Sequence, residues 1–302
     1  MQLPHNRIGR VEFLRTPHDA PPSHLLMLKT AYVDESGHET KTHVMLAGFL
    51  GDDEQWHECA RRWQLALAPR RALHMSELRW KSKTNHRVRK LLERLGPIPY
   101  ECGLMPVFSG VNVSDYADLI SGTLVERASK GYILALYHMV PPILASLKGE
   151  ERLKLVLEEN TQYKPFGGLT EIICSALAKV TTSPIFRTPS GLSRLAGVEF
   201  IPKSSSVLTQ PADYLAFALL QVCRDAKSQK TRWCLPILGD GRGIGQLVSR
   251  EQLRKGLRAT VTGERLKTFR ELESELDPIL ERLGKARKTV RVVIHKTREH
   301  GE

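Results

Sequence analysis

Residues 31–37 read Ala-Tyr-Val-Asp-Glu-Ser-Gly, an apolar run that ends in two carboxylates and a turn. The run over 28–33 lacks helical spacing and contains β-branched and aromatic residues, which predicts a short buried strand that stops at Ser36. Asp34 is therefore expected at the carboxyl end of a strand, the edge at which open α/β sheets form their sites. Two interpretations remain open. Asp34 either caps its own turn, or lies in a crevice with an arginine, a backbone turn or a metal ion as its partner.

Further strands and helices are predicted along the chain from the spacing of apolar residues. The apolar run at 44–50 predicts an antiparallel hairpin with the first strand. Residues 153–157 repeat the opening pattern and end in Glu158 and Glu159. Additional strands are expected at 98–108, where the prolines confine it to an edge or to bulged pairing, and at 197–201. Helices are expected after Asp52, over about 85–95, over 114–147 with a break near Gly131, over 168–180, and up to about Arg224.

The last of these helices carries the acid Asp213. Proline is tolerated in a first helical turn, so Pro211 predicts that Thr209 caps the helix and that Asp213 lies in its first turn. Such a position favours the ionised carboxylate, since it lies near the positive end of the helix dipole. Asp213 is thus either a charge that stabilises the helix start or a member of a site.

Composition bounds the class of protein. With 302 residues and ordinary apolar and charged content, the chain is long enough for a full core, and one elaborated domain is favoured over two. No apolar run is long enough for a transmembrane helix. The five cysteines are scattered and form no CxxC, which favours a reducing cytoplasm. Residues 1–27 are expected to be a leader, 28–226 the main domain, and 227–302 an extension with a flexible glycine-rich loop and a basic tail.

A basic segment points to an anionic partner. The net charge is +12, and residues 61–94 carry eleven Lys or Arg against two acids, so that eleven minus two gives +9. This segment lies in a predicted helical insertion at 52–96. It is either a solvated face or a surface for nucleic-acid phosphates, with Trp80 available to stack on a base. The basic side chains singled out for substrate contact are Arg79, Lys81, Lys83 and Arg87.

These motifs together resemble a known family. Tyr-Val-Asp-Glu-Ser-Gly at 32–37, Leu-His-Met-Ser-Glu-Leu at 73–78, the mid-chain strand ending in acids, and Gln210-Pro-Ala-Asp213 are similar to a family of bacterial and phage proteins of unknown function that is assigned a ribonuclease-H-like fold. The resemblance spans about residues 28–224. Glu158-Glu159 stands where the family more usually has an Asp. The fold implied is α/β, with a mixed sheet, helices on both faces, a helical insertion after the second strand and a basic C-terminal extension.

The resemblance also implies a site. In such a fold the first and fourth strands are neighbours at the centre of the sheet, so Asp34 and Glu158 would be adjacent and Asp213 would reach them from a helix packed on the sheet. Three carboxylates in one crevice need a cation between them, and oxygen ligands favour Mg²⁺ or Mn²⁺. Two such ions would support phosphodiester hydrolysis of DNA or RNA, with Asp34 bridging them and Glu158 and Asp213 each holding one.

Four further residues have possible roles in this scheme. Glu35 or Glu159 would support the metal ligands from the next layer of contacts. His74 is a candidate proton shuttle or phosphate contact, although a lone histidine in an insertion is more often a surface or packing residue. Gln210, one helical turn before Asp213, would contact substrate or orient a carboxylate.

Several other functions are considered on the same residues. A phosphoaspartyl hydrolase would need a second acid two residues after Asp34, where Ser36 stands. The glycine-rich segment matches neither a P-loop nor a dinucleotide fingerprint. No GxSxG or HExxH pattern supports a serine hydrolase or a zinc protease. The alternative from a different class is a nucleic-acid-binding protein of the same fold without catalysis.

Overall fold

The computed structural model of the chain describes residues 10–12, 27–37, 43–68, 74, 75, 77, 78, 85–115, 129–158, 184–202, 206–224, 237–239 and 243–248. The predicted helix at 168–180, the basic tail and Glu159 lie outside these residues. The elements, in chain order, are β1 (Arg10–Glu12), β2 (Leu28–Ser36), β3 (His43–Gly51), α1 (Asp53–Leu67), α3 (His86–Leu95), α4 (Ile98–Glu101), β4 (Met105–Asn112), α6 (Ser129–Ser146), β5 (Arg152–Glu158), the 3-10 helix η3 (Pro184–Phe186), β6 (Leu195–Ile201), α8 (Thr209–Arg224) and β7 (Ile244–Val248).

The strands form one seven-stranded mixed sheet in the order β1-β6-β5-β2-β3-β4-β7 within the described residues. β2 lies at the centre, antiparallel to β3 on one side and parallel to β5 on the other, with Val33 opposite Leu157. The predicted adjacency of the first and fourth strands of the main domain is therefore confirmed. Since β5 begins more than a hundred residues after β2 ends, the segment between them crosses over to reach this position, as a parallel pair requires.

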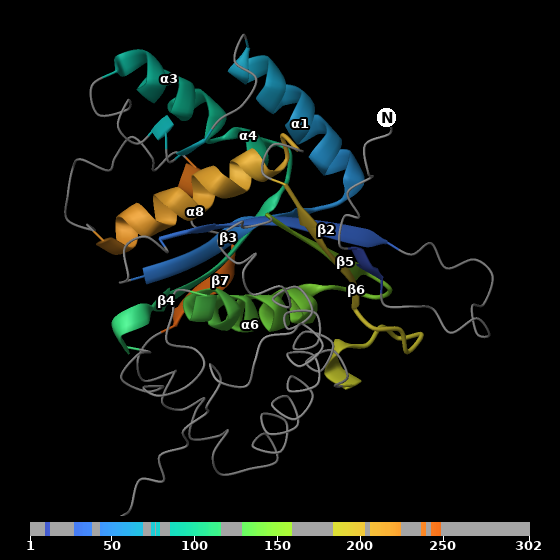
Figure 1. Cartoon of the computed structure of the whole chain (residues 1–302). Helices are drawn as coiled ribbons and strands as arrows, with labels where there is room; N and C mark the ends of the chain where they lie inside the picture. Colours follow the sequence, from blue (N-terminus) through green and yellow to red (C-terminus); the bar gives the residue numbers. More distant parts are fainter. Residues whose placement is uncertain are drawn as a thin grey trace, which may run out of the picture.

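Helices cover both faces of the sheet, which confirms the α/β class (Figure 1). Alternate residues of the strands face opposite sides, so each face has its own apolar core. On one face α6 packs against residues such as Ala31, Val33 and Leu155. On the other, α1, α3 and α8 pack against Ala47 and Phe49. In Figure 1 these two layers lie below and above the sheet. No described helix is long and apolar enough to cross a membrane.

Four features of the sheet differ from the sequence predictions. Residues 98–108 are not one strand: Ile98–Glu101 form α4, where Pro99 occupies a first turn, and the strand begins at Met105. β4 is internal, because it pairs with β7 over residues 107–111, and Pro106 lies just outside that pairing. The glycine-rich segment, predicted as a flexible loop, runs into strand β7. Finally, β1 pairs with β6, so the predicted leader contributes a strand.

The helix starts mostly follow the predicted caps. Asp52 forms a capping box with Gln55 at the start of α1, and Asn85 accepts two backbone N–H groups at the start of α3. α8 begins at Thr209, the residue expected to cap it. α6 begins at Ser129 and runs through Gly131, and residues 116–128, on which the expected break near Gly131 also depends, lie outside the described residues.

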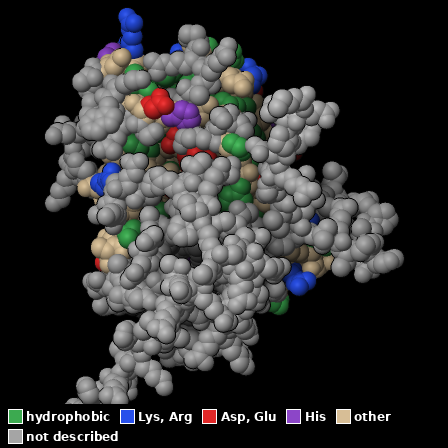
Figure 2. All heavy atoms as spheres, in the orientation of Figure 1, with side chains coloured by type: hydrophobic (Ala, Val, Ile, Leu, Met, Phe, Trp, Pro, Cys, Tyr) green, Lys and Arg blue, Asp and Glu red, His purple; other side chains and the backbone are tan. Residues whose placement is uncertain are grey.

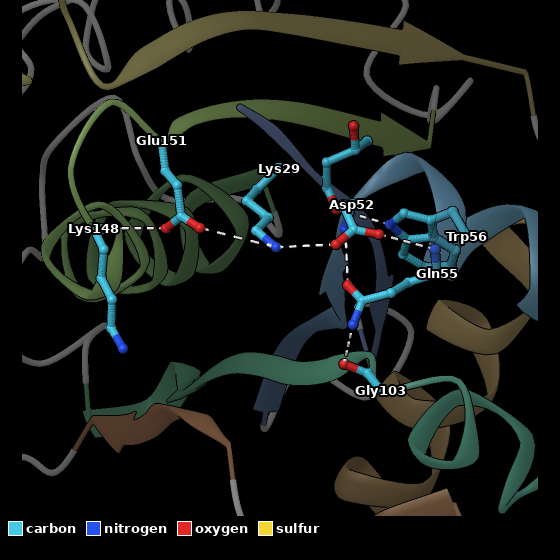
Figure 3. Close-up of polar contacts among 8 residues, drawn as sticks. Lys29, Asp52, Gln55, Trp56, Gly103, Lys148 and Glu151 are labelled. Carbon is cyan, nitrogen blue, oxygen red and sulfur yellow. Dashed lines mark hydrogen bonds and ion pairs between the residues drawn. The ribbon is translucent and has the colours of Figure 1, made fainter. Parts of the chain in front are cut away.

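A polar network at the amino ends of β2 and β5 ties the sheet to α1 (Figure 3). Lys29 Nζ lies 3.2 Å from Asp52 Oδ2 and 3.9 Å from Glu151 Oε1. The Gln55 amide donates to the carbonyl oxygen of Gly103 at 2.8 Å, and the Trp56 indole donates to that of Thr30 at 2.9 Å. These contacts fix α1 at the amino edge of the sheet, which leaves the carboxyl edge of β2 and β5 for other roles.

Substitutions of Asp52 should separate its cap from its charge. Asp52→Ala removes both, and we expect a loss of about 1 kcal/mol of unfolding free energy, the usual cost of an N-cap. Asp52→Asn keeps a capping oxygen and removes the ion pair with Lys29, which is partly exposed and should contribute less than about 1 kcal/mol. Urea unfolding of both variants checks this prediction. Equal losses in the two would mean that the ion pair, and not the cap, stabilises α1.

Candidate active site

Asp34, two residues before the end of β2, and Glu158, the last residue of β5, lie on the same face of the sheet in neighbouring parallel strands. Val33 is opposite Leu157, so the next residues of β2 and β5 are Asp34 and Glu158. Val33 and Leu157 belong to the core on the α6 side, so alternation directs the two acids to the side on which α8 packs. Asp34 is only 4% exposed, and its Oδ1 accepts the backbone N–H of Glu35 at 2.7 Å. Oδ2 of Asp34 and Oε2 of Glu158 are buried.

Asp213 lies on α8, the helix that packs across β2 and β3. It is 8% exposed, and its Oδ2 accepts the backbone N–H of Met75 at 2.9 Å. The prediction that it lies in the first turn is wrong, because α8 begins at Thr209 and its first turn has no acid. The hydrogen bond with Met75, more than the helix end, is therefore the interaction that orients this carboxylate.

Gln210 has a structural partner. Its Oε1 accepts the indole N–H of Trp63 at 3.2 Å, and Gln210 is itself buried. Trp63 comes from α1 and is fully buried in the core on that side. This contact ties α8 to α1; it shows neither of the two roles predicted for Gln210, contact with substrate or orientation of a carboxylate.

His74 directly precedes Met75, the residue whose backbone N–H binds Asp213, so it lies close to this acid. Its carbonyl oxygen accepts the N–H groups of Glu77 and Leu78, each at 3.1 Å, and Met75 and Leu78 anchor this short turn in the core. The Nδ1 atom of His74 is buried and has no hydrogen-bond partner among the described residues. A histidine one residue from the Asp213 contact, with a ring nitrogen still able to bond, suits the predicted proton-transfer role.

The structure does not place the other predicted site residues beside Asp34, Glu158 and Asp213. Glu35 pairs with Leu46 in β3, and alternation puts it on the α6 side, opposite Asp34. Arg87 is exposed on α3 and, with Lys90, forms no ion pair with a described residue. The residues Glu159, Arg79, Trp80, Lys81 and Lys83 lie outside the described residues.

The basic segment is less cationic on its surface than its sequence suggests. Arg61 pairs with Glu58 at 2.6 Å, and Arg62 pairs with Glu101. Arg94 donates to the carbonyl oxygen of Ala66, near the end of α1. The first contact lies within α1, and the other two join α1 to α4 and α3, so part of the +9 charge is used inside the helical layer and the exposed cations of α3 remain for a partner.

The donor set is suited to a hard divalent cation. Asp34, Glu158 and Asp213 offer carboxylate oxygens, some of them buried, on one side of the sheet, and such ligands favour Mg²⁺ or Mn²⁺ over zinc. Among the described side chains, no group of three or more His, Cys, Asp or Glu is already arranged to hold a metal ion. Figure 2 shows acidic and histidine side chains near one another on the upper part of the molecule, where Figure 1 has α1, α3 and α8.

Two positioning contacts could not be predicted from spacing. Trp63 and the N–H of Met75 hold α8 and its acid, yet each joins residues more than 130 positions apart. The apolar pattern around Trp63 predicts only that it is buried. The face occupied by Glu35, in contrast, follows directly from the two-residue period of a strand.

Two half-buried histidines should make stability depend on pH. Burial lowers the pKa of His43, with Arg224 acting in the same direction and Asp115 in the opposite one, and burial also lowers the pKa of His138. The unfolded chain therefore binds these protons more readily, so stability is complete above the unfolded pKa of about 6.5 and is lost as the pH falls through it towards the folded values.

We expect the melting temperature to fall between about pH 7.5 and 5.5, and the variants His43→Gln and His138→Gln to reduce this fall. Circular dichroism melts at constant ionic strength measure it. If both variants keep the slope of the parent protein, the two histidines are not its source.

Comparisons with family models, curated proteins and solved structures give no match to this chain.

Proposed function

We propose that the protein is a metal-dependent nuclease of ribonuclease-H-like fold that hydrolyses phosphodiester bonds in DNA or RNA. The observation that carries this proposal is the placement of Asp34 and Glu158 side by side near the carboxyl ends of β2 and β5, on the side of the sheet covered by α8 with Asp213. The order β4-β3-β2-β5-β6, in which β3 alone is antiparallel to its neighbours, supports the fold that the sequence resemblance implies.

Each residue has a distinct task in the proposed mechanism. Asp34, Glu158 and Asp213 would hold one or two Mg²⁺ or Mn²⁺ ions, which supply charge stabilisation and an activated water for in-line displacement. The Met75 N–H fixes Oδ2 of Asp213 and so helps to hold this carboxylate in place. His74 would give a proton to the leaving oxygen or accept one from water.

Exposed cations support the choice of substrate. Arg87 and Lys90 lie on the outer side of α3, three residues apart on one helical face. Each phosphate neutralised by such a side chain releases counterions, so binding should weaken steeply with salt. A cytoplasmic location is proposed with this function, since Cys59, Cys102 and Cys223 are free thiols.

One observation favours a second candidate, a nucleic-acid-binding protein that does not cleave. No ready group of three metal-ligating side chains exists among the described residues, while the exposed cations of α3 are present. Binding alone would need only the cations.

An assay of the purified chain separates the two functions. Single- and double-stranded DNA and RNA are incubated with Mn²⁺, with Mg²⁺ and with EDTA, and both cleavage and binding are measured. Cleavage of any of them that requires the metal supports the nuclease. Salt-sensitive binding without cleavage under all conditions supports the second candidate, and absence of both rejects the two together.

A further inference from the structure

The last turns of α8 lie over the point where β2 ends and β3 begins. Gly37 follows β2 with φ of +107°, a conformation that suits glycine in a turn. A Cβ atom placed on Gly37 would meet the carbonyl oxygen of His43 and would lie 3.0 Å from Leu220 Cδ1. The hairpin and this part of α8 are therefore in close contact beyond the carboxyl end of β2.

Two half-buried polar side chains in this region each have a shielded nitrogen without a partner. Nδ1 of His43 and Nε2 of Gln221 are both shielded from solvent, and neither has a hydrogen-bond partner among the described residues. His43 lies at the first position of β3, and its alternation with Ala47 and Phe49 directs it towards α8. Gln221 follows Leu220 on α8. Buried polar atoms in folded proteins nearly always have a hydrogen-bond partner. Two nitrogens without one, both near the contact between Gly37 and Leu220, therefore suggest that a ligand binds here.

The charges around these nitrogens favour an anion. Arg224 lies three residues after Gln221 on α8, so the two share a helical face, and it is close enough to act electrostatically on His43. An amide NH₂ group is a donor only, and a neutral imidazole with its proton on Nδ1 is a second donor. Asp115 also acts on His43 and is the opposing charge. A guanidinium and two neutral N–H donors are groups that bind a tetrahedral oxyanion such as phosphate.

We propose that His43, Gln221 and Arg224 form a phosphate subsite at the hairpin end of α8. The inference rests on the proposed nuclease function in one respect, that the phosphate belongs to the nucleic-acid strand. Gly37 is three residues beyond Asp34, or about 10 Å at roughly 3.3 Å per residue. The subsite thus holds a phosphate group other than the one at the carboxylates and positions the strand across the end of β2.

Melting of the full chain in inorganic phosphate tests the subsite without metal or cleavage. Phosphate should raise the melting temperature of the parent protein more than chloride at equal ionic strength, because a ligand of the folded state stabilises it. Gln221→Leu and Arg224→Gln should each weaken phosphate binding at least about tenfold, the loss expected for one hydrogen bond to a charged group. Without phosphate, Gln221→Leu should melt at the same temperature as the parent or higher, since it removes an unsatisfied buried donor.

A matched control is Arg187→Gln, in the loop after η3, whose guanidinium donates to the carbonyl oxygen of Gly191. It removes the same charge from another part of the molecule and should leave phosphate binding unchanged. The subsite is rejected if Gln221→Leu and Arg224→Gln bind phosphate as the parent does, if chloride stabilises as well as phosphate, or if Arg187→Gln has the same effect.

Binding of an oligonucleotide in EDTA identifies the source of the phosphate. A backbone phosphate at this subsite predicts that Arg224→Gln weakens binding and lowers the slope of log affinity against log salt by about 1. Loss of inorganic phosphate binding with unchanged oligonucleotide binding would instead support a free phosphate as the ligand. If the parent protein cleaves nucleic acid and the subsite variants keep both its KM and its phosphate affinity, the subsite fails while the nuclease stands. If phosphate binds as expected and no substrate is cleaved, the subsite stands and the proposed nuclease function fails.

Discussion

Asp34→Asn and Asp213→Asn are each expected to lower metal-dependent cleavage at least about 100-fold while the variants still bind nucleic acid. Asparagine keeps the shape of the side chain and removes the charge that would hold the cation. The expected loss is on the scale seen when one preorganised charge-stabilising group is removed from an active site. Both carboxylates are buried on the side where β2 meets α8, so neither is needed for contact with an extended strand at the surface. Cleavage rates and oligonucleotide affinities of the same preparations measure the two effects.

Two control variants make this result specific. Asp53→Asn changes an exposed acid in the first turn of α1 and should cleave at the rate of the parent protein. Glu35→Gln changes the neighbour of Asp34 on the other side of the sheet, and it too should keep most of the activity. Mn²⁺ binding by calorimetry gives an independent measurement, in which only the Asp34 and Asp213 variants should be weaker. If Asp34→Asn and Asp213→Asn both cleave as fast as the parent protein, the active site is elsewhere.

Gly48→Ala is expected to cost about 3 kcal/mol of unfolding free energy, at the upper end for overpacking of a core. A Cβ atom on Gly48 would overlap the carbonyl oxygen of Tyr32 and lie 2.9 Å from the Cα of Val33. Both are backbone atoms of β2, so the two central strands would have to separate next to Asp34. Urea unfolding measures the loss, and any surviving folded protein should bind Mn²⁺ more weakly.

Gly51→Ala is the matched control on the same strand. Its added Cβ would meet the Leu104 side chain and the Gln55 side chain, which can move, so we expect a smaller loss of about 1 kcal/mol or less. A Gly48→Ala variant as stable as Gly51→Ala would mean that the contact between β2 and β3 adapts easily.

The strands around Asp34 could be predicted because their signal is local. The apolar runs of β2, β3 and β5 each stop at polar residues, and these stops place Asp34 near the end of β2 and Glu158 at the end of β5. Residues 98–108 were harder, because an apolar run with two prolines is compatible with a strand or with a helical turn followed by a strand. β7 was missed because its pairing with β4 depends on a distant partner and not on its own glycine-rich sequence.

The candidate site is harder to predict from the sequence than the sheet is. The bond between Asp213 and Met75 uses a backbone N–H, which every residue except proline has, so no pattern marks it. The orphaned nitrogens of His43 and Gln221 can be recognised only when the whole surroundings are known. The basic charge of residues 61–94 overstated the exposed cations, because its partners Glu58 and Glu101 lie outside that segment.

The crossover between the central strands has a consequence for biosynthesis. Val33 and its neighbour Leu157 are separated by 124 positions (157 minus 33), and Asp213 follows Asp34 by 179 (213 minus 34). At about 5–20 residues per second, a ribosome needs roughly 10 to 40 s to progress from the first of these acids to the last. During that interval the nascent polypeptide lacks the full set of three carboxylates, so the proposed hydrolytic activity can arise only after Asp213 has been translated.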